Sequence, residues 1–461
     1  MDLIGRFDRD LKELSTDFTL EALADELQPA IEQTLREHQK DRQRKSVLSP
    51  LLTTWLILAL PLQRSLGYLN VLGWLLSGLR HRFPRIDRRP VTDGAITHAR
   101  KRMGVGIFRD LFRHSTQTAA AIVEDFHGLI SVIIDGSILT APDTPENAVH
   151  WGKPTASLRR GTAGFPQVRL VGLLVARCHV MLDTVFGPSR GKGTGEVTVA
   201  RDLVLRNARQ GLLFLLDRGF WAVEFLEEIL IRGADFLVRV PSGPKLKAIK
   251  GSRRSDGSYL AWIENPKTGA RRKVRVVRYQ IPGFRCDRIA TSLLDQAISS
   301  LELVRHYHRR WEVELAYASL KVRQSGRKTG QCPTLLRSKL PELVEQEVYA
   351  LLTAFNLVRL LIRKAAAAHK LDPLAISLTD ALRVILEAVV EMRGARAELL
   401  PDIYARLLRD IAACVMPRRR RPRVYPRVVK TQRSRFPLKR WNQCEIRRDL
   451  NAEIQVLAAR A

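Results

Sequence analysis

The chain has 461 residues, of which 45% are hydrophobic, so it can bury two or three domain cores and does not have a disordered composition. Its 77 lysines and arginines outnumber 47 acidic residues, which gives a formal net charge of +30. This imbalance predicts a polyanionic partner. Nucleic acid is favoured because phosphate neutralisation releases counterions, and an anionic membrane surface is the competitor.

The apolar pattern disfavours a membrane location. The most apolar run, residues 47–62, contains Ser49, Pro50 and Pro61 and falls short of the ~20 apolar residues that a spanning helix needs. The first residues of the chain lack the apolar core of a signal peptide. Five scattered cysteines without CxxC spacing fit a reduced compartment and argue against a disulfide framework or a zinc site. We therefore expect a cytoplasmic protein.

Residues 1–125 are predicted to form a helical amino-terminal domain that binds DNA. Ser49 suits a helix N-cap, with Pro50 at the first helical position. Further helices are expected at residues 20–35 and 93–102, with basic runs at 40–45 and 80–85. Small helical units separated by basic linkers suit DNA docking, although an ordinary helical domain with solvated cations is a serious alternative.

Residues 126–368 follow an α/β pattern. Residues 131–135 and 211–217 are short apolar runs typical of buried strands, and each ends in an aspartate. Residues 167–177 and 179–186 predict two strands joined as a hairpin. The remaining expected elements are helices at 195–207, 222–232 and 344–368 and a strand at 235–240.

Two further regions complete the predicted organisation. The turn-rich residues 241–290 predict an inserted β-rich subdomain, and residues 369–461 predict a helical region with a basic tail. Within that tail, residues 417–440 hold eleven lysines or arginines and no acid, and prolines prevent a regular helix. Phosphate contact is the favoured use of the tail, and a solvated basic segment is the alternative.

Asp135 and Asp217 terminate the two apolar runs. Open α/β sheets place ligands at the carboxyl ends of their strands, so both side chains could project at one edge. Each aspartate taken alone is more often a turn or cap residue, because Asp-Gly and Asp-Arg-Gly are also turn sequences.

Residues 307–321 are the most informative segment and are predicted to be helical. Four side chains follow one another at intervals of 3, 4 and 7: Tyr307, Arg310, Glu314 and Lys321. At about 100° per residue they fall on one narrow stripe. A carboxylate able to hold a divalent cation would then be flanked by groups suited to phosphate. The alternative is a solvated face on which Arg310 and Glu314 pair at i,i+4, worth only about 0.2–0.5 kcal/mol.

Asp135, Asp217 and Glu314 together would make a cluster of three carboxylates in a strongly basic protein. Such groups repel one another unless cations neutralise them, which predicts hard divalent metal, Mg²⁺ first and Mn²⁺ as a substitute. Two such ions ~3.5–4 Å apart can assist an in-line displacement at phosphorus. A glycosidase-type carboxylate pair is possible on residue types, but the net charge favours a phosphate substrate. Four histidines are interpreted as structural or DNA-facing: His150, His179, His306 and His308.

Four motifs carry a family resemblance. They are Asp-Gly-Ser at Asp135, Gly-Phe-Pro at Gly164, Asp-Arg-Gly-Phe at Asp217, and Tyr-x2-Arg-x3-Glu-x6-Lys beginning at Tyr307. Together they resemble the DDE transposases of bacterial insertion sequences, in the IS-four group. The resemblance covers most of the chain, most securely residues 130–365.

The resemblance implies an RNase H-like core, a mixed sheet flanked by helices, in which the three carboxylates hold the metals. It assigns phosphate contacts at the element end to Tyr307, Arg310 and Lys321. It also implies a homodimer in the synaptic complex, acting on double-stranded DNA at the terminal inverted repeats and the target, close to the bacterial nucleoid.

The favoured interpretation is therefore a cut-and-paste transposase, which hydrolyses the phosphodiester at the element ends and then joins the 3′-OH to target DNA. A plain nuclease of the same fold and a DNA-binding regulator without catalysis are the alternatives. Trp262 lies where the family has an aromatic residue associated with a hairpin intermediate, but no motif matches it and it is not assigned. Glu196 resembles a recurrent family glutamate, although a helix-start role is favoured.

Overall fold

The computed structural model describes twelve stretches of the chain: residues 21–41, 48–63, 66–76, 91–118, 124–153, 164–189, 191, 193–281, 286–323, 336–392, 395–416 and 454–457. Residues 42–45 of the basic run predicted at 40–45, the run predicted at 80–85 and the tail at 417–440 lie outside them. The chain forms two compact units. The first unit comprises Met1–Val123, Asp135–Leu203 and Glu312–Val415, and the second comprises Glu124–Ile134, Val204–Trp311 and Met416–Ala461.

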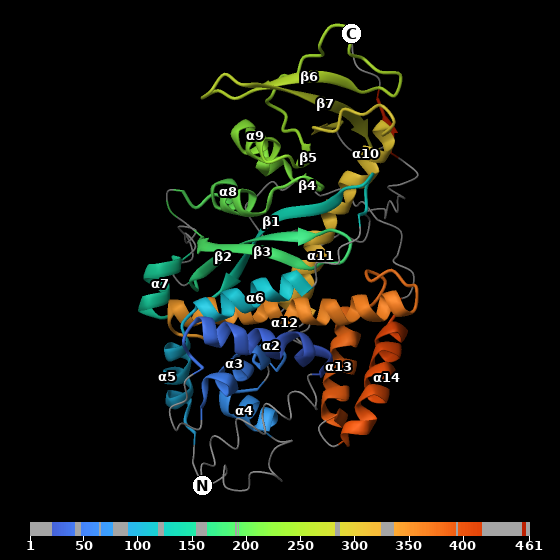
Figure 1. Cartoon of the computed structure of the whole chain (residues 1–461). Helices are drawn as coiled ribbons and strands as arrows, with labels where there is room; N and C mark the ends of the chain where they lie inside the picture. The colour runs from blue at the N-terminus through green and yellow to red at the C-terminus, as the bar shows by residue number, and fades with distance from the viewer. Residues whose placement is uncertain are drawn as a thin grey trace, which may run out of the picture. The chain divides into compact units, whose positions relative to one another are not determined.

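The first unit is largely helical. Its longer helices are α2 (Glu21–Glu37), α3 (Pro50–Ala59), α4 (Tyr68–Leu76), α5 (Asp93–Met103), α6 (Gly106–Thr118), α12 (Pro341–Ala368), α13 (Leu378–Met392) and α14 (Leu400–Ala413). Figure 1 shows α12 alongside α6, with α13 and α14 side by side at its carboxyl-terminal half. Most of the 28 residues of α12 are buried, so this helix forms the centre of the unit.

The predicted cap of α3 is confirmed. The Ser49 hydroxyl accepts a hydrogen bond from the Leu52 amide at 3.2 Å, and Pro50 opens the helix. Every residue from Leu51 to Ala59 is buried, so the apolar run is a core helix. Among the residues described, no helix is both long and apolar enough to cross a bilayer.

The predicted hairpin is also confirmed. Strand β2 (Gln167–Val175) pairs antiparallel with β3 (Met181–Pro188), and β2 neighbours β1 (Ile130–Thr140). The Asn356 side chain of α12 accepts from the Met181 amide and donates to the Met181 carbonyl, both at 2.9 Å. This contact fixes the start of β3 against α12. The same unit contains α7 (Pro145–Trp151) and the start of α8 (Glu196–Asn207).

The second unit contains a mixed sheet with strand order β1-β4-β5-β8-β7-β6, and β9 (Gln455–Val456) pairs with β7. Its strands are β4 (Leu212–Leu216), β5 (Asp235–Arg239), β6 (Tyr259–Glu264), β7 (Arg271–Gln280) and β8 (Asp287–Thr291). The β1–β4 and β4–β5 pairs are parallel, and the other pairs are antiparallel. All five residues of β4 are buried, as expected for a strand covered on both faces. The predicted α/β class is correct.

Strand β1 differs from its prediction. The sequence suggested a strand that ends at Asp135, whereas the strand continues to Thr140. The pairing of β1 with β4 ends at Ile133, β1 also has β2 as a neighbour, and Asp135 lies inside the strand. The physical reason is tertiary strand pairing, which overrides the local turn tendency of Asp-Gly.

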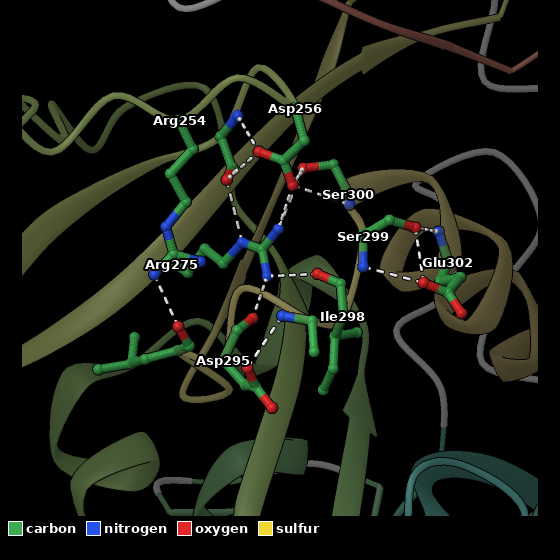
Figure 2. A network of polar contacts seen from close by, with 11 residues as sticks. Arg254, Asp256, Arg275, Asp295, Ile298, Ser299, Ser300 and Glu302 are labelled. Carbon is green, nitrogen blue, oxygen red and sulfur yellow. Dashed lines mark hydrogen bonds and ion pairs between the residues drawn. The ribbon is translucent and has the colours of Figure 1, made fainter.

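Residues 241–290, the predicted β-rich insertion, contain the β6–β7 hairpin and most of β8. A buried arginine ties the hairpin to helix α10 (Ser300–Tyr307). Figure 2 shows Arg275 of β7 donating to the Asp295 carbonyl at 2.8 Å, to the Ile298 carbonyl at 2.7 Å and to the Asp256 carboxylate. Asp256 in turn accepts from the Ser300 amide and hydroxyl at 3.1 and 2.8 Å. Because Arg275 is fully buried, these acceptors are needed to balance its charge.

Replacing Asp256 with asparagine should lower the free energy of unfolding by about 2 kcal/mol, because a buried guanidinium loses its charged partner. Equilibrium urea unfolding at neutral pH measures the loss. The control is Arg271→Ala on the same strand, whose exposed pair with Glu264 contributes less than about 1 kcal/mol. Equal losses in the two variants would contradict this role for Asp256.

Acid should remove the same stabilisation. Burial opposes ionisation of Asp256, but hydrogen bonds from Ser258 and Ser300 and the charge of Arg275 outweigh it and lower the pKa from 3.8 to about 2. The contribution is therefore complete above pH 3.8 and disappears as the pH falls towards 2. The difference in urea midpoint between wild type and Asp256→Asn should narrow over that interval.

Candidate active site

The predicted helix over residues 307–321 is not a single regular helix. Helix α10 ends at Tyr307, a 3₁₀ turn η4 (His308–Trp311) follows, then α11 (Glu312–Ala318) and a π-helical segment η5 (Ser319–Arg323). The prediction that the four side chains at positions 307, 310, 314 and 321 fall on one stripe of a regular helix is therefore wrong. The 3₁₀ turn accompanies the packing of the His308 ring edge-on against Tyr279, with centroids 5.8 Å apart, which the helical period does not reveal.

Tyr307 and Arg310 nevertheless lie close together in the second unit. Burial raises the pKa of the Tyr307 phenol, the adjacent Arg310 guanidinium lowers it, and the Asp217 carboxylate raises it again. The phenol is thus protonated at physiological pH and can donate a hydrogen bond.

Asp135 and Asp217 each lie just beyond the last pair of the β1–β4 register. Strands β1 and β4 pair in parallel from Ile130 opposite Leu212 to Ile133 opposite Leu215. Each aspartate follows the last paired residue of its strand by two positions, and each is half-buried.

In the first unit, Lys321 lies near Asp135. Burial lowers the pKa of the Lys321 ammonium to about 8, and the negative charge of Asp135 partly offsets this. Tyr317 of α11 donates from its hydroxyl to the Asp135 carbonyl at 2.8 Å. The backbone of β1 is therefore bonded directly to the short helix that carries Glu314.

Glu196 belongs to the surroundings of Asp135, which the sequence did not reveal. It starts α8, as favoured, and its carboxylate accepts from Arg169 of β2 at 3.0 Å. A Cβ atom built on Gly136 would lie 2.5 Å from Glu196 Oε1. A larger residue at this position would therefore require the Glu196 side chain to shift. A glycine inside a strand is the one sequence signal for such an approach, and here it follows Asp135 directly.

Glu314 is exposed on α11. Carboxylate oxygens are hard donors, so the chemistry of Asp135, Asp217 and Glu314 fits a divalent cation such as Mg²⁺. Over the described part of the chain, no group of three or more histidine, cysteine, aspartate or glutamate side chains is arranged to hold a metal ion. The shared metal site of these three residues stays a prediction.

Two family comparisons agree with the fold. Residues 127–357 match the family described as the transposase DDE domain, and residues 18–113 match the insertion element 4 transposase amino-terminal region. The matched DDE region contains all six predicted site residues.

The chain belongs to the DDE transposases, enzymes that cleave and join DNA and that generally depend on divalent metal. Within them it is a member of the insertion element 4 group. The transposase InsG for insertion sequence element IS4 of Escherichia coli K12 is 28% identical over 457 residues, which covers 95% of this chain and 96% of InsG. A second protein of that strain, InsZ, is 31% identical over 144 residues, covering 31% of this chain and 46% of InsZ.

Gly172→Ala should displace Tyr317 from the Asp135 carbonyl. An added Cβ would lie 2.5 Å from Met181 Sδ and 2.9 Å from Tyr317 Oη. We expect a loss of about 1–3 kcal/mol from overpacking, measured by thermal and urea unfolding.

Gly187→Ala is the matched control. Gly187 is buried on the partner strand β3, and an added Cβ meets nothing within 4 Å. It should change stability by less than about 0.5 kcal/mol. Equal effects at the two glycines would refute the crowding around Tyr317.

Proposed function

We propose that the protein catalyses cut-and-paste transposition of an insertion sequence. It hydrolyses the phosphodiester at each end of its element and then transfers the 3′-OH to target DNA. The observation that carries this proposal is that Asp135 and Asp217 each follow, by two residues, the last pair of the parallel strands β1 and β4, Ile133 and Leu215. A chain of this family with a net charge of +30 is suited to an extended DNA substrate.

Asp135, Asp217 and Glu314 are proposed as the carboxylates that hold two Mg²⁺ ions, with Mn²⁺ as a substitute. When bound, such ions neutralise charge on the attacking and leaving oxygens of an in-line displacement at phosphorus. The aspartates are suited to this because each lies on a sheet strand or directly after one, which limits the movement of its backbone.

Tyr307, Arg310 and Lys321 are proposed to contact phosphates of the bound element end. The phenol of Tyr307 is protonated and can donate to a phosphate oxygen, and Arg310 beside it offers a planar donor group. Lys321 keeps a substantial charged fraction at neutral pH, since the pKa of its ammonium is about 8. These three side chains would position the phosphodiester rather than transfer protons.

The remaining parts are proposed to recognise and pair the ends. The amino-terminal helices would bind the terminal inverted repeats, and two copies would join the two ends in a synaptic homodimer at the nucleoid. The predicted domains are an amino-terminal DNA-binding domain (1–125), a catalytic domain (126–368) and a carboxyl-terminal region (369–461).

Amide variants test the carboxylates. Asp135→Asn, Asp217→Asn and Glu314→Gln should each lower Mg²⁺-dependent cleavage of an end by about 10²–10⁴-fold, because several kcal/mol of transition-state stabilisation is lost. Binding of the end, measured without divalent metal, should change little. Asp143→Asn is the control, since that aspartate pairs with Lys153 at the surface. Normal cleavage by any amide variant would remove its residue from the site.

The substrate for this assay is the DNA flanking the coding region, with its inverted repeats. Joined donor and target products support transposition, whereas cut donor alone would indicate a plain nuclease. End binding without any cutting would indicate a regulator.

Charge removal tests the phosphate contacts. Arg310→Ala and Lys321→Ala should each weaken end binding and reduce the slope of log K against log salt by about one. Arg406→Ala is the control, because that arginine pairs with Glu391 on the surface of α13 and α14. An unchanged slope would assign Arg310 or Lys321 to a solvated face.

A further inference from the structure

Helix α11 is too short to define its own position. It has seven residues and lies between a 3₁₀ turn and a π-helical segment. Isolated helices of this length are unstable in water, so tertiary contacts must hold it. Tyr317 near its end is bonded to the Asp135 carbonyl at 2.8 Å. Its first residue, Glu312, has an anchor of a different kind.

That anchor is His179, in the connection between β2 and β3. Its side chain is buried, with Nε2 2.8 Å from Glu312 Oε2 and Nδ1 3.2 Å from the Arg359 guanidinium. Arg359 belongs to the central helix α12 and is itself 4% exposed. Its guanidinium carbon also lies 5.5 Å from the centre of the Phe355 ring.

The donor pattern defines the state of the imidazole. A guanidinium only donates hydrogen bonds, so Nδ1 of His179 must be an acceptor without a proton. Nε2 then carries the proton and donates to Glu312. The contacts thus form a directed chain from Arg359 through neutral His179 to Glu312, in a buried environment where such bonds strengthen one another.

The backbone at His179 is strained, which indicates that the surrounding contacts hold this residue in place. Its φ is 59°, in the left-handed region that residues other than glycine seldom adopt. Such conformations persist only where the surroundings enforce them. Here two side chains of α12 hold the β2–β3 hairpin. Asn356 bonds to the backbone of Met181, and Arg359, about one helical turn further along α12, bonds to the side chain of His179.

We infer that His179 is a positioning residue for Glu314. It connects the buried central helix α12 to the first residue of α11, while Tyr317 connects the last turn of α11 to β1. Glu314 lies between the two anchors, so they fix the position and rotation of the helix backbone that carries it. This inference rests on the proposed catalytic role of Glu314. It adds that the hydrogen-bonded chain of Arg359, His179 and Glu312 positions the helix segment that carries the Glu314 carboxylate.

The main variant is His179→Asn. Asparagine tolerates the left-handed backbone and keeps an acceptor near Arg359, but it is too short to reach Glu312. The matched control is His127→Asn, because His127 is also left-handed, with φ 45°, and faces Glu302 at 3.7 Å. Glu312→Ala breaks the same link from the other side, and Glu312→Gln keeps an oxygen that can accept from Nε2.

Two readouts are measured. Hydrogen exchange of residues 312–318, followed by mass spectrometry without divalent metal, should be about tenfold faster in His179→Asn and Glu312→Ala. Cleavage of fully bound DNA in Mg²⁺ should slow about 10–100-fold, the range seen when residues supporting metal ligands are changed. The dissociation constant for DNA should stay within about twofold. His127→Asn should match wild type, and Glu312→Gln should restore most of the cleavage rate.

Wild-type exchange and cleavage in His179→Asn would overturn the inference, and so would equal losses in His127→Asn. If His179→Asn does not fold, the comparison of Glu312→Ala with Glu312→Gln decides, and equal activity in those two overturns it. Normal cleavage by Glu314→Gln would instead refute the proposed function and the inference with it. An inactive Glu314→Gln together with a fully active His179→Asn refutes the positioning role alone.

Discussion

The parallel pairing of β1 with β4 is the constraint on which the proposed chemistry depends. All five residues of β4 are buried, as expected for a strand packed on both faces. Its last pair with β1 is Ile133 opposite Leu215, and Asp135 and Asp217 each follow that pair by two residues. The placement of the two aspartates along the chain therefore depends on this strand pairing.

Glu314 depends on a different kind of support. The aspartates are carried by a sheet, whereas Glu314 is carried by seven helical residues between two irregular turns. Hydrogen bonds to side chains replace the support that a long helix would provide. Burial of the Arg359, His179 and Glu312 chain makes these bonds stronger and makes their loss more costly. The contacts of Glu312 and Tyr317 thus hold the backbone at Glu314, as strand pairing holds the backbone at the two aspartates.

Local signals in the sequence predicted most of the fold. The apolar run of β4, the β2–β3 hairpin and the Ser49 cap depend on neighbouring residues, and all three are confirmed. The end of β1 and the form of residues 307–321 were wrong, because pairing beside β2 and packing around His308 are non-local. The contact of Glu196 with Gly136 was also missed, since sixty residues separate them. The contact between His179 and Glu312 could not be predicted for the same reason, since the two residues are far apart in the sequence.

The interleaving of the two units has a consequence for the gene. The chain passes from one unit to the other after Val123, Ile134, Leu203, Trp311 and Val415. Neither unit is encoded by one uninterrupted stretch of codons, and strand β1 is divided between the two units. A frameshift or premature stop anywhere before the last crossing removes part of both. The truncated product of such a gene therefore contains neither unit in full.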